Sequence, residues 1–329
     1  MAVTGTARQF VVSHPGHGKI VRVDLPPRQE DAVLVRARYS GISRGTETLV
    51  FRGAVPPSQY EAMRAPFQQG DYPGPVTSGY SSVGVVEEGP ETLAGRTVFS
   101  LYPHQDRYLV PAAAVHPVPD DVPAERAVLA ANMETAVNIA WDAAPVVGSR
   151  IVVIGGGVVG LLAAARCRDV AATSVTVVDP NRSRESVADA LGLQWRPDPP
   201  PAATADLVIH ASGAPGGLRA ALDVAAMEGT IVEASWYGAR EVTLPLGEAF
   251  HVRRLTIRSS QVGRVPPRRA AEWTRERRLR FALSLLADGR FDALITHESP
   301  FEEVPRVMAR LSAAPDDTLC HRIRYGNGA

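Results

Sequence analysis

The sequence predicts an α/β protein in which a strand-rich region precedes a doubly wound parallel sheet. Three observations predict this fold. Residues 7–118 read as short strands between turn residues, β-branched runs separated by helical stretches follow, and a glycine-rich turn joins the first of these runs to a helix. Buried strands that alternate with helices are typical of βαβ units on a parallel sheet.

The composition limits the class of protein. A chain of 329 residues is long enough for two domains, and its 35 basic residues balance 35 acidic ones, so no basic field predicts a nucleic-acid partner. The longest apolar run, 151–165, is too short and too rich in glycine to span a bilayer. No export signal is apparent at the start. We therefore expect a cytoplasmic protein that acts on a small molecule, without a membrane partner.

The cysteines predict neither a disulfide framework nor a thiolate zinc site. Cys167 and Cys320 are far apart and have no partner at metal-type spacing. Each is expected to be a small buried hydrophobic residue.

The strand-rich region is followed by a change of period near Pro119. Alternation is clearest in DAVLVRARYS (31–40), and turn residues gather in HPGHGK, LPPRQED and DYPGPVTSG. From Pro119 the stretch ERAVLAANMETAVNIAWDAA is predicted to be helical. The region before it is therefore expected to contain little helix.

The parallel sheet is predicted from five β-branched runs. They are RIVVI, SVTVV, ADLVIHA, GTIVEAS and LTIRSS, with helical stretches such as VVGLLAAARCRD and GGLRAALDVAAM between them. Proline-rich residues 196–206 are a predicted loop. After Val262 one long helix is predicted through RRAAEWTRERRLRFALSLLADG, and its arginines are expected to form a solvated face. A last strand is predicted near CHRIRY.

The glycine-rich turn predicts a dinucleotide site. Gly155, Gly157 and Gly160 have G-x-G-x-x-G spacing after a strand and before a helix. The first glycine permits the tight turn, the second lets backbone approach a pyrophosphate, and the third lets the helix pack on the strand. The N–H groups at the start of the helix, at Val158 and Val159, are expected to face the phosphates.

The next strand favours NAD over NADP. Asp179 ends SVTVVDP, about twenty residues after the glycines as this fingerprint expects. A carboxylate there accepts hydrogen bonds from the ribose hydroxyls and repels a 2′-phosphate. Arg182 and Arg184 follow closely and are the alternative, a grip on that phosphate. A sheet of this kind that has lost its cofactor is a further alternative.

Serines at the ends of later strands are further candidates for cofactor contact. Ligands of such sheets lie beyond the carboxyl ends of the strands. Ser212, Ser235 and Ser259 stand at those ends and are expected to touch ribose or nicotinamide, although serine is also a common turn former.

These features together resemble the medium-chain dehydrogenase/reductase superfamily. YSGISRGTE, PGPVTSGYSSVG, PHQDRYLVPA and LTIRSSQVG are most similar to the branch that contains the bacteriochlorophyllide hydroxyethyl dehydrogenase, which oxidises a secondary alcohol with NAD. The resemblance implies a GroES-like catalytic domain over 1–118, completed by 290–329. It also implies a Rossmann NAD-binding domain over 119–289 and a homodimer formed through the sheet edge near LTIRSS.

The resemblance also predicts that zinc is absent. Zinc-dependent members take a cysteine where Ser43 stands and a histidine where Tyr80 stands. Only Glu134, in NMETA, still offers an oxygen at the third position. A serine, a tyrosine and one carboxylate do not make the N/S/O ligand set that catalytic zinc requires.

Side-chain donors are then needed to stabilise the substrate oxygen in place of a Lewis acid. Tyr80 and the hydroxyl of Ser43 are candidates, with a core aromatic as the alternative for Tyr80. His104 in LYPHQD is a candidate general base, or a satisfied loop residue. Thr46 and Glu47 lie where the resemblance implies a relay hydroxyl and an acid.

Three of these assignments have open points. The extra Arg44 shifts the alignment of Thr46 and Glu47 by one residue, and a structural ion pair is the alternative for Glu47. Glu134 is a candidate base if burial raises its pKa. Thr135 is implied to contact the nicotinamide side.

The leading hypothesis is therefore a zinc-independent, NAD-dependent oxidoreductase that moves hydride between nicotinamide and a secondary alcohol or ketone of a small molecule, possibly a biosynthetic intermediate. The alternatives are an NADPH-dependent quinone or enoyl reductase, a redox-neutral epimerase with tightly bound NAD, and a non-catalytic nucleotide-binding protein. The substrate is not encoded in any readable motif.

Overall fold

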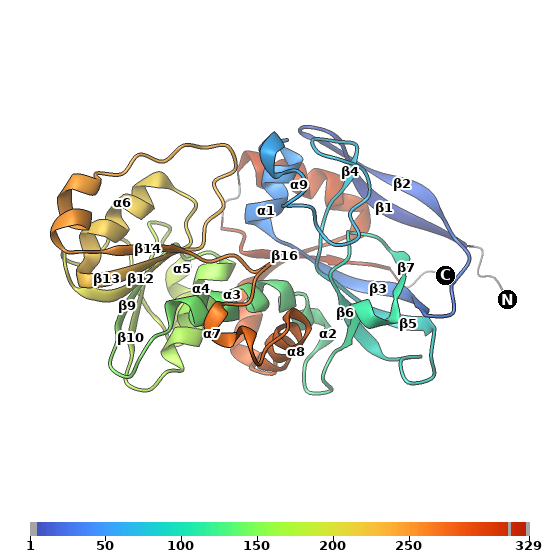
Figure 1. Cartoon of the computed structure of the whole chain (residues 1–329). Coiled ribbons are helices and arrows are strands. Elements are labelled where there is room, and N and C mark those ends of the chain that lie inside the picture. Colours follow the sequence, from blue (N-terminus) through green and yellow to red (C-terminus); the bar gives the residue numbers. More distant parts are fainter. Residues whose placement is uncertain (1–4, 315–316, 327–329) are drawn as a thin grey trace. The chain divides into compact units, whose positions relative to one another are not determined.

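The protein divides into two compact units (Figure 1). The computed structural model describes residues 5–314 and 317–326. The first unit comprises Met1–Ala131, Leu283–Asp288 and Ile295–Ala329, and the second comprises Asn132–Ala282 and Gly289–Leu294. Within the described ranges, no helix combines the length and apolar character needed to cross a membrane.

The first unit consists mainly of strands. They are β1 (Gly5–His14), β2 (His17–Leu25), β3 (Ala32–Ile42), β4 (Val76–Thr77), β5 (Ser82–Glu88), β6 (Thr97–Ser100), β7 (Arg107–Pro111), β8 (Val115–Pro117), β15 (Ile295–Pro300) and β16 (Cys320–Arg324). Its helices and helical turns are α1 (Arg44–Phe51), η1 (Pro57–Gln59), η2 (Ala112–Ala114), α2 (Ala124–Ala127), η5 (Phe301–Glu303) and α9 (Val304–Ala313). The predicted strand-rich beginning is confirmed, with α1 as its longest helix.

Two sheets form this unit. One has the order β2-β1-β4, and the other has the order β15-β16-β3-β5-β6-β8 with β7 also paired to β3. Strand β3 is apolar on both faces at Val33, Leu34 and Val35, which have no exposed surface, because it lies inside the mixed sheet. Strand β16, from the end of the chain, pairs antiparallel with β3.

The second unit is the predicted α/β sheet. Its strands are β9 (Arg150–Ile154), β10 (Ser174–Val178), β11 (Gln194–Arg196), β12 (Ala205–His210), β13 (Ala225–Glu233) and β14 (Thr256–Ser259). Its helices and helical turns are α3 (Ala130–Ala143), α4 (Val158–Arg168), α5 (Arg184–Ala190), α6 (Pro215–Val224), η3 (Leu246–Phe250), α7 (Pro267–Ala270), α8 (Arg275–Leu285) and η4 (Gly289–Leu294). The first residues of α3 belong to the first unit.

The six strands are all parallel and have the order β11-β10-β9-β12-β13-β14. This is the doubly wound order in which the chain reverses direction between β9 and β12. Val208 and Ile231 of the sheet pack against Leu218 and Leu222 of α6, which explains the helical spacing of the apolar residues in that segment. The carboxyl ends of β9 and β12 are therefore neighbours, where such sheets bind ligands.

The prediction of one long arginine-rich helix after Val262 is wrong in one respect. The segment is two helices, α7 and α8, because the Thr274 hydroxyl accepts the Arg277 N–H at 3.1 Å and caps a new helix start. The predicted solvated arginine face is also wrong for Arg278, whose side chain is 1% exposed.

Both cysteines are buried free thiols, as expected. Burial raises the pKa of Cys167 and of Cys320 to about 12, so both stay protonated at neutral pH.

Candidate functional site

The glycine loop between β9 and α4 has the geometry of a phosphate cradle. Gly155 has a φ of +114°, and a side chain there would lie 2.6 Å from the backbone nitrogen of Ser212. A side chain on Gly160 would overlap the Gly155 carbonyl oxygen, so α4 can approach β9 only with glycine here. Gly157 faces open space. The first turn of α4, with half-buried Val158 and Val159, therefore begins where a pyrophosphate can reach backbone N–H groups.

Asp179 lies directly beside this loop. Its Oδ2 accepts the Gly156 N–H at 2.7 Å and its Oδ1 accepts the Asn181 N–H at 2.9 Å. The Arg184 side chain is 4% exposed, and its Cγ would be 3.3 Å from a Cβ on Gly156. The structure thus brings the predicted glycines, Asp179 and Arg184 together.

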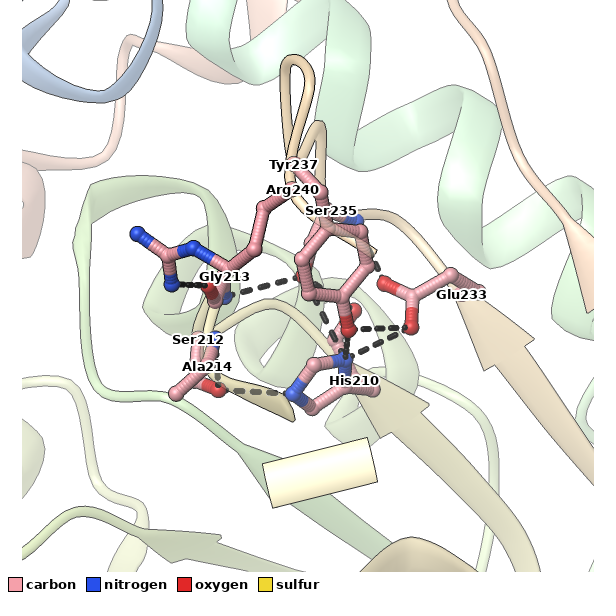
Figure 2. Close-up of polar contacts among 8 residues, drawn as sticks. All are labelled: His210, Ser212, Gly213, Ala214, Glu233, Ser235, Tyr237 and Arg240. Atoms are coloured by element: carbon pink, nitrogen blue, oxygen red, sulfur yellow. Dashed lines mark hydrogen bonds and ion pairs between the residues drawn. The ribbon is translucent and has the colours of Figure 1, made fainter. Parts of the chain in front are cut away.

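A strand-end cluster lies at the carboxyl ends of β12 and β13 (Figure 2). It consists of His210, Ser212, Glu233, Ser235 and Tyr237. His210 Nδ1 is 2.7 Å from Glu233 Oε2, and His210 Nε2 is 2.6 Å from Ser212 Oγ. Ser235 Oγ accepts the Gly213 N–H at 3.0 Å, so two of the three predicted serines, Ser212 and Ser235, lie in one hydrogen-bonded group.

Glu134 of α3 is paired with a buried arginine of α8. Arg278 donates from Nε and Nη2 to Oε1 of Glu134, at 3.0 Å each, and from Nη1 to Asn138. Burial raises the pKa of Glu134, although the charge and hydrogen bonds of Arg278 oppose that effect. Thr135 is half-buried on the same helix. The guanidinium engages one Glu134 oxygen and ties α3 to α8 within the second unit.

His104 lies inside the first unit. It has no exposed surface, and its Nε2 is 2.9 Å from Oε2 of Glu47, which is 2% exposed. Its Nδ1 is 2.8 Å from Ser40 Oγ, and Ser40 Oγ is 2.9 Å from the Tyr325 hydroxyl. A side chain on Gly79 would come within 2.6 Å of the His104 ring. Both ring nitrogens of His104 therefore have partners in a polar network inside the first unit.

Tyr80 and the start of α1 form a separate group of hydroxyls. The Tyr80 phenol lies near the side-chain hydroxyls of Ser43 and Thr46. Burial raises the pKa of Tyr80 to about 12, and the hydrogen bonds of Ser43 and Thr46 oppose part of that rise. Glu47 Oε1 accepts the Ser43 N–H at 2.8 Å, which fixes the turn that carries Ser43. The structure therefore brings three predicted residues together and leaves the phenol protonated at neutral pH.

The resemblance to zinc-dependent dehydrogenases matches their metal ligands to Ser43, Tyr80 and Glu134, and these side chains are a poor ligand set for catalytic zinc. Ser43 and Tyr80 offer a hydroxyl and a phenol, and Glu134 already binds the Arg278 guanidinium. Catalytic zinc takes histidine, cysteine or free carboxylate ligands. In the described part of the chain, no group of three or more His, Cys, Asp or Glu side chains is arranged to hold a metal ion.

The chain is similar to known proteins in sequence over part of its length and in fold over nearly all of it. No protein-family model matches the chain. Over 195 residues it is 26% identical to D-xylulose reductase A of Aspergillus oryzae, a match that covers 53% of this chain and 54% of that protein. The chain thus spans about half the length of this curated relative.

Solved structures match nearly the whole chain. A protein of Sinorhizobium meliloti 1021 named as a zinc-binding dehydrogenase, bound to NADP, superimposes with a TM-score of 0.77 at 18% identity, covering 97% of this chain and 99% of that one. The chain therefore shares the fold of that protein. An alcohol dehydrogenase of Escherichia coli CFT073 complexed with NADH gives a TM-score of 0.75 at 17% identity, covering 97% and 99%. The dehydrogenase fold confirms the predicted doubly wound sheet and GroES-like companion.

Three polar residues of the candidate site, His210, Glu233 and Arg278, were not predicted from the sequence. His210 and Glu233 each end an apolar strand run, and the ends of parallel neighbours meet at one edge of a sheet. That signal could have identified them. No local pattern marks Arg278 as the partner of Glu134, because the two are 144 residues apart in the sequence.

Proposed function

We propose that the protein is a zinc-independent, NAD-dependent oxidoreductase that transfers hydride between nicotinamide and a secondary alcohol or ketone of a small molecule. The observation that carries the proposal is the glycine loop, open at Gly157 and bounded by Asp179, at the point where the sheet reverses direction. The NADP-bound and NADH-bound structures of the same fold support a nicotinamide cofactor. Such a cofactor supplies hydride transfer when it is bound.

The chain's own residues have separate tasks in this reaction. The N–H groups at the start of α4 bind the pyrophosphate, and Asp179 accepts the ribose hydroxyls in place of its present backbone donors. Tyr80 donates a hydrogen bond to the substrate oxygen as charge develops on it, because its phenol keeps its proton at neutral pH. The hydroxyls of Ser43 and Thr46 lie near that phenol.

The direct test combines an activity assay with metal analysis. Purified protein mixed with NAD and a panel of secondary alcohols is expected to produce NADH absorbance, and a chelator is expected to leave the rate unchanged because no step requires a metal. Activity that a chelator removes and zinc restores would contradict zinc independence. Stoichiometric zinc in the isolated protein would do the same.

Cofactor choice gives a second prediction. Asp179→Ala is expected to weaken NADH binding about 10- to 100-fold, the value of hydrogen bonds to one charged acceptor. NADPH binding should improve relative to NADH, because the repulsion of the 2′-phosphate is removed. Fluorescence titration with both cofactors measures this change. Asp189→Ala, an exposed aspartate on α5, is the matched control.

The opposite cofactor preference would favour a different enzyme class. Buried Arg184 next to Gly156 is the observation that supports it, since an arginine there can pair with a 2′-phosphate. Tight NADPH binding and negligible NADH binding by the wild-type protein would place a quinone or enoyl reductase first.

A further inference from the structure

The strand-end cluster contains a hydrogen-bonded chain that leads from solvent into the sheet (Figure 2). Ser212 is exposed, whereas His210 has no exposed surface and Glu233 is half-buried. The serine Oγ lies 2.6 Å from His210 Nε2, and His210 Nδ1 lies 2.7 Å from Glu233 Oε2. The chain therefore runs from an exposed hydroxyl through a fully buried imidazole to a half-buried carboxylate.

The contacts of Glu233 fix the direction of the protons in this chain. Its Oε1 accepts the Ser235 N–H at 2.7 Å, and its Oε2 accepts the Tyr237 hydroxyl at 3.0 Å. Burial by itself raises the pKa of Glu233, but the hydrogen bonds that it accepts from His210 Nδ1 and the Ser235 N–H hold that pKa below its usual value. An ionised carboxylate only accepts hydrogen bonds, so His210 Nδ1 carries a proton. In neutral imidazole Nε2 then accepts the Ser212 hydroxyl proton.

Ser212 is left with one outward acceptor position. Its proton points to His210, and one lone pair accepts the Ala214 N–H at 3.2 Å. The second lone pair remains for a group that donates a proton. Gly213 and Gly216 face open space, so a ligand can reach it. A side chain on Gly217 would lie 2.5 Å from Ser212 Oγ, so glycine is needed there for the chain to form.

The position of this acceptor is that of a ligand site. Ser212 follows β12 directly, and its backbone nitrogen lies against Gly155 of the cofactor loop. The chain reverses direction between β9 and β12, and ligands of doubly wound sheets bind in the crevice at that point.

We propose that Ser212, His210 and Glu233 form a proton-accepting site for a secondary hydroxyl group of the bound ligand. The ligand hydroxyl donates to Ser212 Oγ. When that proton leaves its oxygen, Ser212 takes it up and passes its own proton to His210 Nε2, and Glu233 stabilises the imidazolium. The hydroxyl belongs either to the substrate or to a cofactor ribose. Ser212 touches the ligand, and His210 and Glu233 act through it.

The catalytic part of this proposal, proton transfer during alcohol oxidation, rests on the proposed function. Alcohol oxidation releases a hydride from carbon and a proton from oxygen, so hydride goes to nicotinamide and the proton goes through Ser212 to His210. The same path in reverse returns the proton to solvent. Ligand binding by Ser212 does not require turnover.

The experiment compares Ser212→Ala with the wild-type protein in two arms. Calorimetry measures the affinities for ADP-ribose and ADP, and steady-state kinetics measures kcat/KM between pH 5 and pH 9. If a ribose is the donor, ADP-ribose affinity falls about 3- to 10-fold and ADP affinity stays unchanged. If the substrate is the donor, ADP-ribose affinity is unchanged, kcat/KM falls about 10²-fold and the acidic limb of the pH profile flattens.

Three further variants separate the relay from a structural role. Ser212→Thr keeps the hydroxyl, so its ADP-ribose affinity and its kcat/KM should stay within about threefold of the wild-type values. Glu233→Gln should flatten the acidic limb while Ser212 still binds the ligand. Ser174→Ala removes an exposed serine at the amino end of β10, the opposite edge of the sheet, and should change nothing.

The outcomes of these arms are distinguishable. Unchanged ADP-ribose affinity in Ser212→Ala, together with unchanged or undetectable turnover, would overturn the proton-accepting site. No NADH formation by the wild type, but weaker ADP-ribose binding by Ser212→Ala, would leave the site standing and would defeat the dehydrogenase proposal.

Discussion

Replacing Tyr80 with phenylalanine is expected to lower kcat/KM for a secondary alcohol by about 10²- to 10³-fold, the effect of removing one donor to a developing oxyanion. The physical reason is that this phenol is the donor proposed to polarise the substrate oxygen. The ring and its packing remain in Tyr80→Phe, so the change removes a hydroxyl and little else. NADH affinity should be unchanged, because the cofactor loop belongs to the other unit.

The pH dependence follows from the direction of the pKa shift. Burial raises the pKa of Tyr80 to about 12, above the ordinary value for tyrosine, so the phenol is protonated at every pH below about 10. A donor that is always protonated adds no limb to the pH profile there. The loss in Tyr80→Phe should therefore be equal at pH 7 and pH 9, which kinetics at both values measures.

Tyr72→Phe is the matched control for this substitution. Tyr72 is a buried tyrosine of the same unit whose hydroxyl donates to the Met63 carbonyl at 3.1 Å, and burial raises its pKa to about 12 as well. Its loss should leave kcat/KM nearly unchanged. If Tyr80→Phe keeps more than a third of wild-type activity, Tyr80 is a core aromatic and the assignment of the donor is wrong.

A second large effect is expected on stability. His104→Ala should lower the free energy of unfolding by about 3–5 kcal/mol, the cost of leaving a buried charge without its partner. Glu47 is 2% exposed, and among the described residues it would keep the Ser43 N–H at 2.8 Å and the Ser78 hydroxyl at 3.4 Å as its hydrogen-bond donors. Chemical denaturation measures the loss. His17→Ala, at an exposed histidine of the same unit, should change stability little.

A double-mutant cycle identifies the cause. Glu47→Gln removes the charge, so His104→Ala should cost less in that background than in the wild type. Equal costs in both backgrounds would exclude the ion pair as the origin of the loss. A stability change below about 1 kcal/mol, with a 10²-fold loss of activity, would instead support His104 as the general base.

The fold was largely predictable because its signals are local. β-branched runs, helical spacing and the G-x-G-x-x-G turn each occupy a short stretch of sequence, so the predicted strands, the helices after them and the glycine turn are confirmed. The prediction of one long helix after Val262 failed because Thr274 caps the start of a second helix within the continuing helical pattern.

The site was predictable only in part. The glycines, Asp179, Ser212 and Ser235 follow from where strands end. Glu47 and His104 were each singled out, but their pairing was not, because 57 residues separate them and the side of the sheet that each faces depends on strand register.

The sequence by itself determined a doubly wound sheet whose first strand is joined to its helix by a G-x-G-x-x-G turn. Tertiary structure alone decided which buried polar side chains meet: Glu47 with His104, Glu134 with Arg278, and Glu233 with His210. The reason is that glycine conformations and strand periods are set by neighbouring residues, whereas these contacts form between elements that only packing brings together.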